Sequence, residues 1–317
     1  MKIIIILLLL LSGCKATKED GNSSTTHFSI TDPSGRTVII KHPINRIIST
    51  APSNTEIITD LGMAHKLVAI DRHSANVKAP AKYQSPIRCP EIPDGIPLLD
   101  FFFPDAEVII NLEPDIIIAS GHNPTGTGED PFQLLREAGI PVAYISMSKN
   151  IDDIYRDIAF IAEILSAQKN GEELILSMKE QIAQITQKAA LIETKKTVYF
   201  EISAAPQMFT FGKDSFINDM ISTIGARNIF ENENWLVSPS AEAIIDRNPD
   251  VILTNVDYIP DPIGELKSRP GFNHISAIAN DRIYQIDTDS SVRSSSRIIL
   301  AMRQMAYAVY PEVYDNQ

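Results

Sequence analysis

Residues 104–118 read PDAEVIINLEPDIII, and residues 239–253 read PSAEAIIDRNPDVIL. Eight of the fifteen aligned positions are identical. In each copy the first proline suits the start of a helix and the second proline ends it. The apolar run after the Pro-Asp pair is typical of a buried strand. The chain therefore repeats one helix, turn and strand, which indicates two related α/β units.

Each copy also keeps a glutamate, Glu107 in the first and Glu242 in the second. In the first copy, Ala106, Ile109 and Ile110 have the spacing of one apolar helix face, and the glutamate lies about 100° from the centre of that face. Both glutamates are therefore expected to flank the packed side and to reach solvent. A glutamate in the first helical turn also complements the helix dipole, so a purely stabilising role is the alternative.

The residues around the first unit alternate between short apolar runs and helical segments. Residues 27–40 predict an opening hairpin, because two β-rich runs flank the turn sequence of residues 32–35. Ser53 or Asn54 is expected to cap a helix that ends at Gly62. Strands alternating with helices predict a mostly parallel sheet that is covered on both sides. The predicted strands are 46–50, 67–71, 115–120 and 142–146, and the predicted helices are 105–112, 130–139 and 151–166.

A long helical segment, residues 169–193, separates the two repeated units. About 20 helical residues would span some 30 Å, which is enough to cross a small domain. Its apolar residues recur at helical spacing, at Leu174, Met178, Ile182, Ile185 and Leu191. The α/β pattern then restarts, with strands at 197–202, 208–212, 251–255 and 282–287 and helices at 215–225 and 296–310.

The predicted fold class is therefore α/β, with two Rossmann-like lobes of mostly parallel strands, one long rigid helix that joins them and a ligand cleft between them. A chain of 317 residues exceeds the usual size of one domain, which agrees with two lobes. The expected divisions are a signal peptide at 1–14, a tether at 15–27, an N-terminal lobe at 28–167, the bridging helix at 168–193 and a C-terminal lobe at 194–317.

The N-terminus, MKIIIILLLLLSGC, has one lysine, an unbroken apolar run and a small-residue pair before Cys14. This is the layout of a secretory signal peptide, and the run is shorter than the ~20 residues that a permanent membrane helix needs. The Ser-Gly-Cys end resembles the lipobox of bacterial lipoproteins, in which the cysteine is acylated and becomes the mature N-terminus. We expect an extracytoplasmic protein held to a membrane by lipid alone, although the sequence does not decide which membrane. An uncleaved anchor helix is the alternative.

Charge, cysteine content and missing motifs argue against several classes of partner and activity. The net charge of −12 and the lack of a basic patch argue against nucleic acid or an anionic membrane surface as partner. With Cys14 acylated, only Cys89 remains, so an intramolecular disulfide is excluded and Cys89 is expected to be a small apolar residue. The Gly-rich segment 120–128 lacks the Gly-Lys-Ser/Thr ending of a triphosphate loop, and no Gly-x-Ser-x-Gly elbow occurs. No enzymatic activity and no resident cofactor are expected.

Five segments occur in a characteristic order and spacing: ISTAPSNTEIITDLG, EVIINLEPDIII, FTFGKDSFINDMISTIGARNIF, AEAIIDRNPDVIL and SSSRIILAMRQMAYAV. Together they resemble the substrate-binding proteins of ABC importers for iron complexes and vitamin B12, in the class whose two lobes are bridged by a single helix. The resemblance covers about residues 28–310, and the C-terminal lobe especially resembles the cobalamin-binding members. It implies a monomeric receptor that captures a ferric siderophore, haem or a cobalamin-type corrinoid and delivers it to an ABC permease with a cytoplasmic ATPase.

In that family a glutamate on each lobe pairs with arginines of the permease. The matching positions here are Glu107 and Glu242. Two lobes that dock on a two-fold permease require one such glutamate each, which would explain why the unit is repeated. A single rigid helix between the lobes further implies only a small closure on ligand binding.

Ligands of parallel α/β sheets contact the loops at the carboxyl ends of the strands. Arginine in these loops offers a planar fork of donors to an anionic group of the ligand. His73 and His122 would be axial ligands to iron or cobalt, and no other metal ligand is expected. The candidate ligand-binding residues are Ser53, Asn54, Arg72, His73, His122, Asn123, Phe200, Met208, Asp289 and Arg293.

One departure from the family leaves the ligand open. Where the cobalamin binder has two aromatic residues before its last helix, this chain has Ser290 and Ser291, which offer no flat surface to a corrin ring. A lipid-anchored zinc or manganese receptor is one alternative, although the histidines show no close-spaced metal pattern. A scaffold or adhesion lipoprotein is another, but it leaves the duplication of the lobes unexplained.

Overall fold

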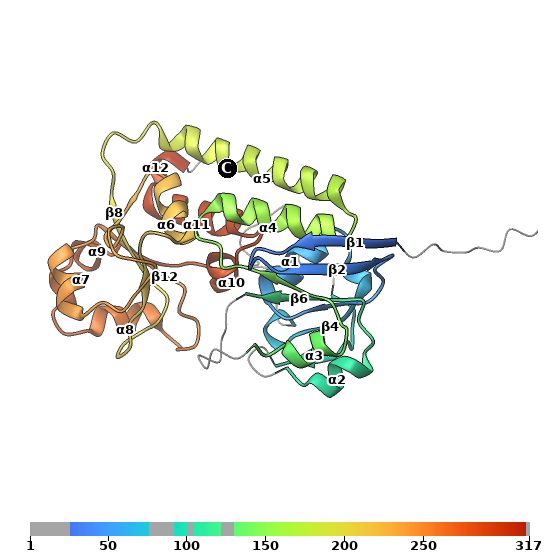
Figure 1. Cartoon of the computed structure of the whole chain (residues 1–317). Coiled ribbons are helices and arrows are strands. Elements are labelled where there is room, and N and C mark those ends of the chain that lie inside the picture. Colours follow the sequence, from blue (N-terminus) through green and yellow to red (C-terminus); the bar gives the residue numbers. More distant parts are fainter. Residues whose placement is uncertain (1–25, 76–91, 101–103, 122–129, 315–317) are drawn as a thin grey trace, which may run out of the picture.

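A computed structural model describes residues 26–75, 92–100, 104–121 and 130–314, and it contains two parallel sheets that lie at opposite ends of the molecule (Figure 1). The first sheet has the strand order β5-β4-β3-β6-β7, and the second has the order β10-β8-β12-β13. All neighbouring strands in both sheets run parallel. The predicted α/β fold class is therefore confirmed. The strands are β3 (Ile47–Ser49), β4 (Leu67–Asp71), β5 (Leu98–Leu99), β6 (Ile116–Ser120), β7 (Val142–Ile145), β8 (Thr197–Glu201), β10 (Arg227–Asn228), β12 (Val251–Thr254) and β13 (Ile283–Gln285).

The N-terminal lobe begins with an antiparallel hairpin, as predicted. Asp32 in its turn accepts hydrogen bonds from the backbone N–H groups of Ser34 and Arg36, both at 3.0 Å. Its other carboxylate oxygen accepts one from the backbone of Tyr144 in β7, also at 3.0 Å, so the turn is tied to the sheet. The elements of this lobe that flank the sheet are β1 (Thr26–Thr31), β2 (Thr37–His42), α1 (Pro52–Asp60), η1 (Ala64–Lys66), η2 (Arg72–Ser74), α2 (Ala106–Asn111), α3 (Gln133–Glu137) and α4 (Ile151–Ile164).

The start of α1 differs from the prediction. Neither Ser53 nor Asn54 is the N-cap, which is Ala51, and no side chain caps this helix. Pro52 occupies the first helical position, where its fixed φ suits the helix and its missing N–H group is not needed. The helix therefore begins directly at the end of β3, and Ser53 and Asn54 lie in its first turn.

The C-terminal lobe contains the second copy of the repeated unit. Its helix α7 is followed by β12, as α2 is followed by β6 in the first lobe. Ser240 caps α7 through its side chain, and Asp105 caps α2 in the same way. The remaining elements of the lobe are β9 (Thr210–Phe211), α6 (Phe216–Thr223), β11 (Leu236–Val237), α7 (Ala241–Arg247), α8 (Pro262–Ser268), η3 (Phe272–His274), α9 (Ser276–Ala279), α10 (Thr288–Val292), α11 (Ile298–Val309) and α12 (Pro311–Tyr314).

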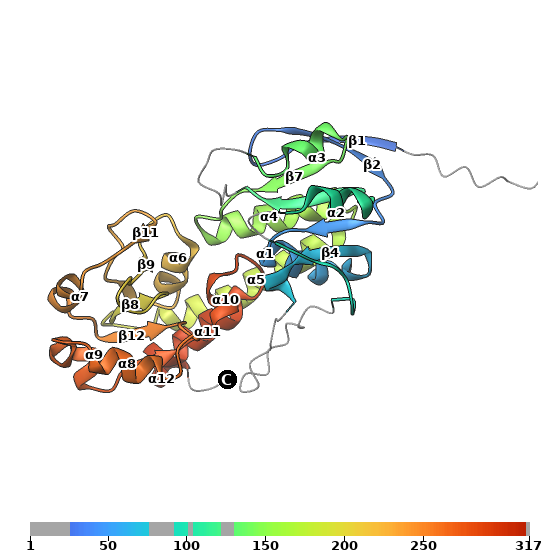
Figure 2. The same cartoon turned by 90° about the horizontal axis from the view of Figure 1, so that it is seen from below.

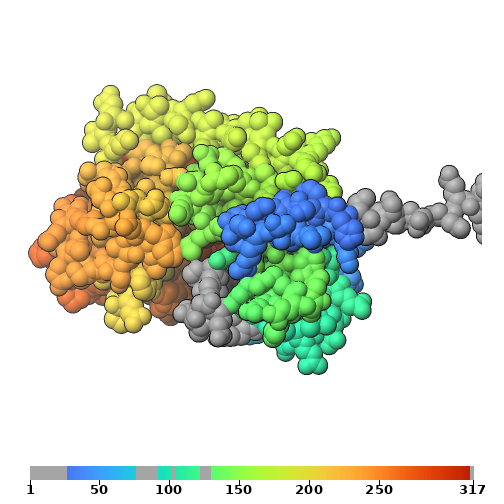
Figure 3. All heavy atoms as spheres, in the orientation of Figure 1, coloured from blue at the N-terminus to red at the C-terminus, as the bar shows by residue number. Residues whose placement is uncertain are grey.

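One long helix, α5 (Gln168–Ala189), connects the two lobes and lies across one side of both (Figures 1 and 3). It contacts α4 of the first lobe and α6, α11 and α12 of the second. Of the predicted apolar stripe, Met178 and Ile185 are buried, whereas Leu191 is 74 % exposed because the helix ends before it. Gly171 permits the close packing on α4, since an added Cβ would lie 2.6 Å from Ala162 Cβ.

Two tyrosines near the C-terminus form hydrogen bonds that join this end of the chain to α5 and its neighbours. The Tyr310 hydroxyl accepts a hydrogen bond from the backbone N–H of Lys196 at 2.7 Å and donates to the Gly225 carbonyl at 2.9 Å. The Tyr314 hydroxyl in α12 lies 3.1 Å from the carbonyl oxygen of Ile185 in α5 and 3.2 Å from that of Ile224. The end of α5, the start of β8 and the end of α6 are therefore joined at one point.

The apolar core is continuous between the lobes. Its largest cluster includes Ile57 of α1, Ile158 of α4, Met178 of α5, Ile217 of α6 and Met302 of α11. Each lobe also has a smaller cluster of its own on the outer side of its sheet. None of the described helices combines the length and the apolar character that a membrane span requires.

Candidate functional site

The two lobes meet where α1 of the first lobe faces the junction of α10 and α11 in the second (Figure 2). α1 follows β3 directly and α10 follows β13, so both begin at the carboxyl ends of parallel strands. Ligands of parallel α/β sheets contact this edge, and the meeting point is therefore the place to look for a site.

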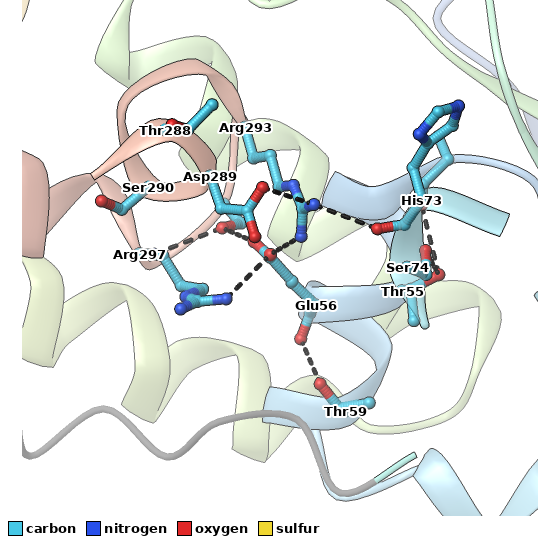
Figure 4. Close-up of polar contacts among 12 residues, drawn as sticks. Thr55, Glu56, Thr59, His73, Ser74, Thr288, Asp289, Ser290, Arg293 and Arg297 are labelled. Carbon is cyan, nitrogen blue, oxygen red and sulfur yellow. Dashed lines mark hydrogen bonds and ion pairs between the residues drawn. The ribbon is translucent and has the colours of Figure 1, made fainter. Parts of the chain in front are cut away.

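Glu56 of α1 is the centre of this contact. It is 1 % exposed, and all of its side-chain donors among the described residues come from the other lobe. Its Oε1 accepts hydrogen bonds from Arg293 Nη1 at 2.8 Å and from Arg297 Nη1 at 3.2 Å, and its Oε2 accepts one from Ser295 Oγ at 2.5 Å (Figure 4). A buried carboxylate is stable only when it is paired and hydrogen-bonded, and Glu56 has both kinds of partner.

Asp60 lies one helical turn after Glu56 and extends the contact. Ser296 Oγ donates to its carboxylate at 2.5 Å. Burial raises the pKa of Asp60 to about 7, the Ser296 bond lowers it, and the nearby charge of Glu56 raises it further. A second hydrogen bond between the lobes joins the start of α4 to α6, where the backbone N–H of Ile151 donates to Asp219 at 3.1 Å.

Arg72 and His73 lie beside the Glu56 contact, on the 3-10 turn η2 that follows β4, and both are exposed. Asp71 caps this turn, because its Oδ1 accepts from the backbone of His73 at 2.9 Å and of Ser74 at 3.2 Å. Figure 4 shows the His73 ring pointing away from Glu56, while its carbonyl oxygen faces Arg293. Of the predicted ligand contacts, these two side chains are the most accessible in the described part of the chain.

Four other predicted contacts are less accessible. Asn54 is 1 % exposed, and its Nδ2 has no hydrogen-bond partner. Phe200 is 1 % exposed within the largest core cluster, so it presents no surface to a ligand. Met208 is 7 % exposed, and its sulfur lies 3.3 Å from Arg269 Nη1. Ser53 is half-buried in the first turn of α1.

Asp289 and Arg293, predicted to contact ligand, contact each other instead. Their side chains form an ion pair at 2.6 Å, and Arg293 also pairs with Glu56. Burial raises the pKa of Asp289, and the charge of Arg293 lowers it. The guanidinium of Arg293 is therefore engaged within the protein. His122, Asn123, Cys14 and Cys89 lie outside the described residues.

Within the described ranges, no three His, Cys, Asp or Glu side chains gather closely enough to form a metal site. Ser290 and Ser291, which stand where the cobalamin binder has aromatic residues, are both buried. Asn255 Nδ2 donates to Ser291 Oγ at 3.0 Å, whereas Ser290 Oγ has no partner. Both serines thus belong to the packing of α10.

Glu107 and Glu242 lie on α2 and α7, far from the Glu56 contact, at the outer part of each lobe. Both are exposed, as the helical spacing predicted. The pKa of Glu242 is lowered by its own backbone N–H and by the Ser240 hydroxyl. Neither forms an ion pair with another described residue.

A second buried acidic cluster lies inside the C-terminal lobe at the end of β8. Glu201 is 1 % exposed, and Arg269 binds it with two hydrogen bonds of 2.5 and 3.0 Å. Arg269 also pairs with Glu265 at 2.5 Å. Burial alone would lower the pKa of Arg269, but its bonds to Glu265 and Glu201 raise it overall.

Sequence reasoning missed Glu56, Ser295, Ser296 and Arg297. Glu56 lies in a helix that was predicted, but a helical glutamate normally reaches solvent. One signal was available, because two arginines, Arg293 and Arg297, lie within five residues of each other just before α11. Two arginines this close together indicate a nearby acidic side chain, although the sequence does not identify that residue.

Known proteins resemble this chain over most of its length. A Bacillus subtilis protein named an uncharacterized ABC transporter substrate-binding lipoprotein, YvrC, is 28 % identical over 98 % of this chain and 96 % of its own. The vitamin B12-binding protein of Vibrio parahaemolyticus is 26 % identical over 82 % of this chain and 87 % of its own. The crystal structure of a possible iron-binding, periplasmic solute-binding protein from Staphylococcus epidermidis superimposes with a TM-score of 0.72 at 29 % identity, over 84 % of this chain and 99 % of that chain. The family model described as periplasmic binding protein matches residues 47–290, and the chain belongs to that family.

Proposed function

We propose that this protein captures a metal chelate between its lobes and delivers it to an ABC permease. The observation that carries the proposal is the contact that Glu56, Arg293 and Arg297 form between the two lobes. This contact turns the carboxyl-end loops of the two parallel sheets toward one another. The names of the relatives, which refer to vitamin B12 and to iron, support a ferric siderophore, haem or a cobalamin-type corrinoid as the ligand.

In this proposal Arg72 and His73 contact the ligand. Both are exposed at the end of β4, and neither has an ion-pair partner among the described residues. The guanidinium of Arg72 suits a carboxylate, a phosphate or a haem propionate. The His73 imidazole would be an axial ligand to iron or cobalt. The metal is cargo and arrives with the ligand.

Glu107 and Glu242 are the proposed docking residues. Each lies at the same position of the repeated unit, one in each lobe, and each is exposed and forms no ion pair with another described residue. Exposed carboxylates at fixed positions suit a partner that presents arginines at a matching separation. We also propose that Cys14 carries the lipid and that the folded body lies outside the cytoplasm.

A titration tests the ligand class. The soluble chain beginning after Cys14 is titrated with haemin, cyanocobalamin and ferric hydroxamate or catecholate siderophores, and binding is followed by their visible absorption and by tyrosine and Trp235 fluorescence. We expect tight binding of one probe and weaker binding of it by Arg72→Ala and His73→Ala. Failure of every probe to bind would overturn the metal-chelate assignment.

A further inference from the structure

Arg293 was expected to bind the ligand, but the structure shows it bonded to other described residues of the protein. Its Nη1 donates to Glu56 at 2.8 Å, and its Nη2 donates to the backbone carbonyl of His73 at 3.1 Å. Asp289 lies 2.6 Å from Nη2. The side chain is 11 % exposed, so little of the guanidinium is accessible from the space between the lobes.

The contact with the His73 carbonyl is notable because it crosses from one lobe to the other. The turn η2 is otherwise held from its own lobe. Asp71 caps it, and Ser74 Oγ donates to Asp71 and lies 3.0 Å from Thr55 Oγ1, which donates to Ser49 Oγ at 2.8 Å. Arg293 is thus the residue through which the C-terminal lobe bonds directly to the backbone that carries Arg72 and His73.

Glu56 fixes the direction in which the Arg293 guanidinium points toward the His73 carbonyl. Three donors within residues 293–297 converge on its carboxylate, so the carboxylate cannot turn without losing at least one bond. The guanidinium is a rigid planar fork, and one nitrogen on Glu56 fixes the direction in which the other nitrogen points. Lysine has a single nitrogen and could not bind Glu56 and the His73 carbonyl with the same geometry.

We infer that Arg293 is a positioning residue: the C-terminal lobe uses it to hold the ligand-contacting turn of the N-terminal lobe, so that Arg72 and His73 are preorganised only when the lobes keep this arrangement. A turn fixed before binding loses less conformational entropy when the ligand arrives, which strengthens binding. The inference rests on the proposed function in one respect, the assignment of Arg72 and His73 to the ligand.

Hydrogen exchange of the ligand-free protein tests the structural part. In Arg293→Gln and Arg293→Lys, we expect the amides of residues 73–75 to exchange at least about tenfold faster than in the parent chain. Arg303→Gln is the matched control, because Arg303 is a partly buried arginine of α11 that bonds Gln181 of α5 at 3.0 Å and lies away from η2. Unchanged exchange in both Arg293 variants would overturn the inference, as would equal acceleration in the control.

A double-mutant cycle tests the functional part with whichever of haemin, cyanocobalamin or the ferric siderophores the parent chain binds. Arg293→Lys should weaken binding about tenfold in the parent chain but less than about twofold in an Arg72→Ala, His73→Ala background. Equal effects in the two backgrounds would mean that Arg293 contacts the ligand directly, which contradicts the inference. If no probe binds the parent chain, the proposed function fails, while hydrogen exchange still decides whether Arg293 holds the turn.

Discussion

Glu56 and Glu201 are two buried glutamates with the same chemistry in different places. Each is 1 % exposed and each is held by arginine. In the described part of the chain, every side-chain partner of Glu201 belongs to its own lobe, whereas the partners of the Glu56 side chain all belong to the other lobe. A buried ion pair can therefore hold the interior of a lobe together, or it can fix how two lobes are placed.

The two glutamates also differ in how their charge is shared. Glu201 depends on one arginine, Arg269, and on a long contact of 3.4 Å from the Tyr199 hydroxyl. Burial raises the pKa of Glu201, and the bonds from Arg269 oppose that rise. Glu56 receives donors from three residues, so the loss of one leaves two. The single-arginine site is expected to be the more fragile of the two.

Arg269→Leu should produce the largest loss of stability. It leaves Glu201 buried without a cationic partner, and breaking a buried pair from one side costs about 3–5 kcal/mol. Urea denaturation followed by circular dichroism measures the change in the free energy of unfolding. Replacing both Glu201 and Arg269 by leucine should recover most of the loss, and a double variant as unstable as the single one would contradict this account.

Arg297→Leu should have a smaller effect, about 1–3 kcal/mol, because Glu56 keeps its bonds to Arg293 and Ser295. The same urea titration provides the comparison. A loss equal to that of Arg269→Leu would show that sharing the charge among three donors does not protect the site between the lobes.

The pH dependence of stability should report on two buried carboxyls, of which Asp60 adjoins the Glu56 contact. Burial raises the pKa of Asp60, beside Glu56, to about 7, and it raises that of Asp157 in α4 to about 7 as well. For both carboxyls the folded state binds more protons than the unfolded state between about pH 4 and 7, so the free energy of unfolding falls as the pH rises through that range.

Asp60→Asn and Asp157→Asn remove this penalty and should each raise the free energy of unfolding at pH 8 by about 1–2 kcal/mol. Ser296 and Ser148 still have an oxygen acceptor in these variants. Melting temperatures from pH 5 to 8.5 provide the measurement. If the melting temperatures of the parent chain and of the double variant Asp60→Asn, Asp157→Asn had the same slope against pH, that result would contradict the expected titration.

The exposed glutamates of the repeated unit should have the smallest effect on stability. Glu107→Ala and Glu242→Ala should each change the free energy of unfolding by less than about 0.5 kcal/mol, because surface substitutions rarely do more. If these residues dock on the permease, both variants should lose ligand uptake in cells while keeping the parent affinity. Glu172→Ala and Glu180→Ala, at exposed positions of α5, are the controls. Normal uptake by the double variant Glu107→Ala, Glu242→Ala would exclude the docking role.

Much of the fold could be predicted because it depends on local patterns. Buried parallel strands such as β6 and β12 are short apolar runs after Pro-Asp, and α5 is a long amphipathic segment. The start of α1 was misplaced by two residues because the helix uses Pro52 at its first position without a side-chain cap. Leu191 was assigned to α5 since spacing alone does not mark where a helix ends.

The site was harder to predict because its contacts join residues that are far apart in the sequence. Glu56 and Arg293 are separated by 237 positions, and nothing local to either residue names the other. Arg293 was therefore taken for a ligand contact from its loop position and its guanidinium group. Phe200 was chosen as an aromatic residue near the end of a strand, but its side chain points into the core. Arg72 and His73, which directly follow a strand, were placed correctly at an exposed turn.

The hydroxyls of Tyr310 and Tyr314 determine which end of this protein can be truncated or tagged. They join the ends of α11 and α12 to α5, β8 and α6, so a chain cut before Tyr314 would leave the carbonyl oxygens of Ile185 and Ile224 without that donor and open the junction. The start of β1, by contrast, lies at the opposite side of the molecule (Figure 1). An affinity tag or a fluorophore therefore belongs ahead of Thr26, and attachment through that end leaves the face between the lobes open to a ligand.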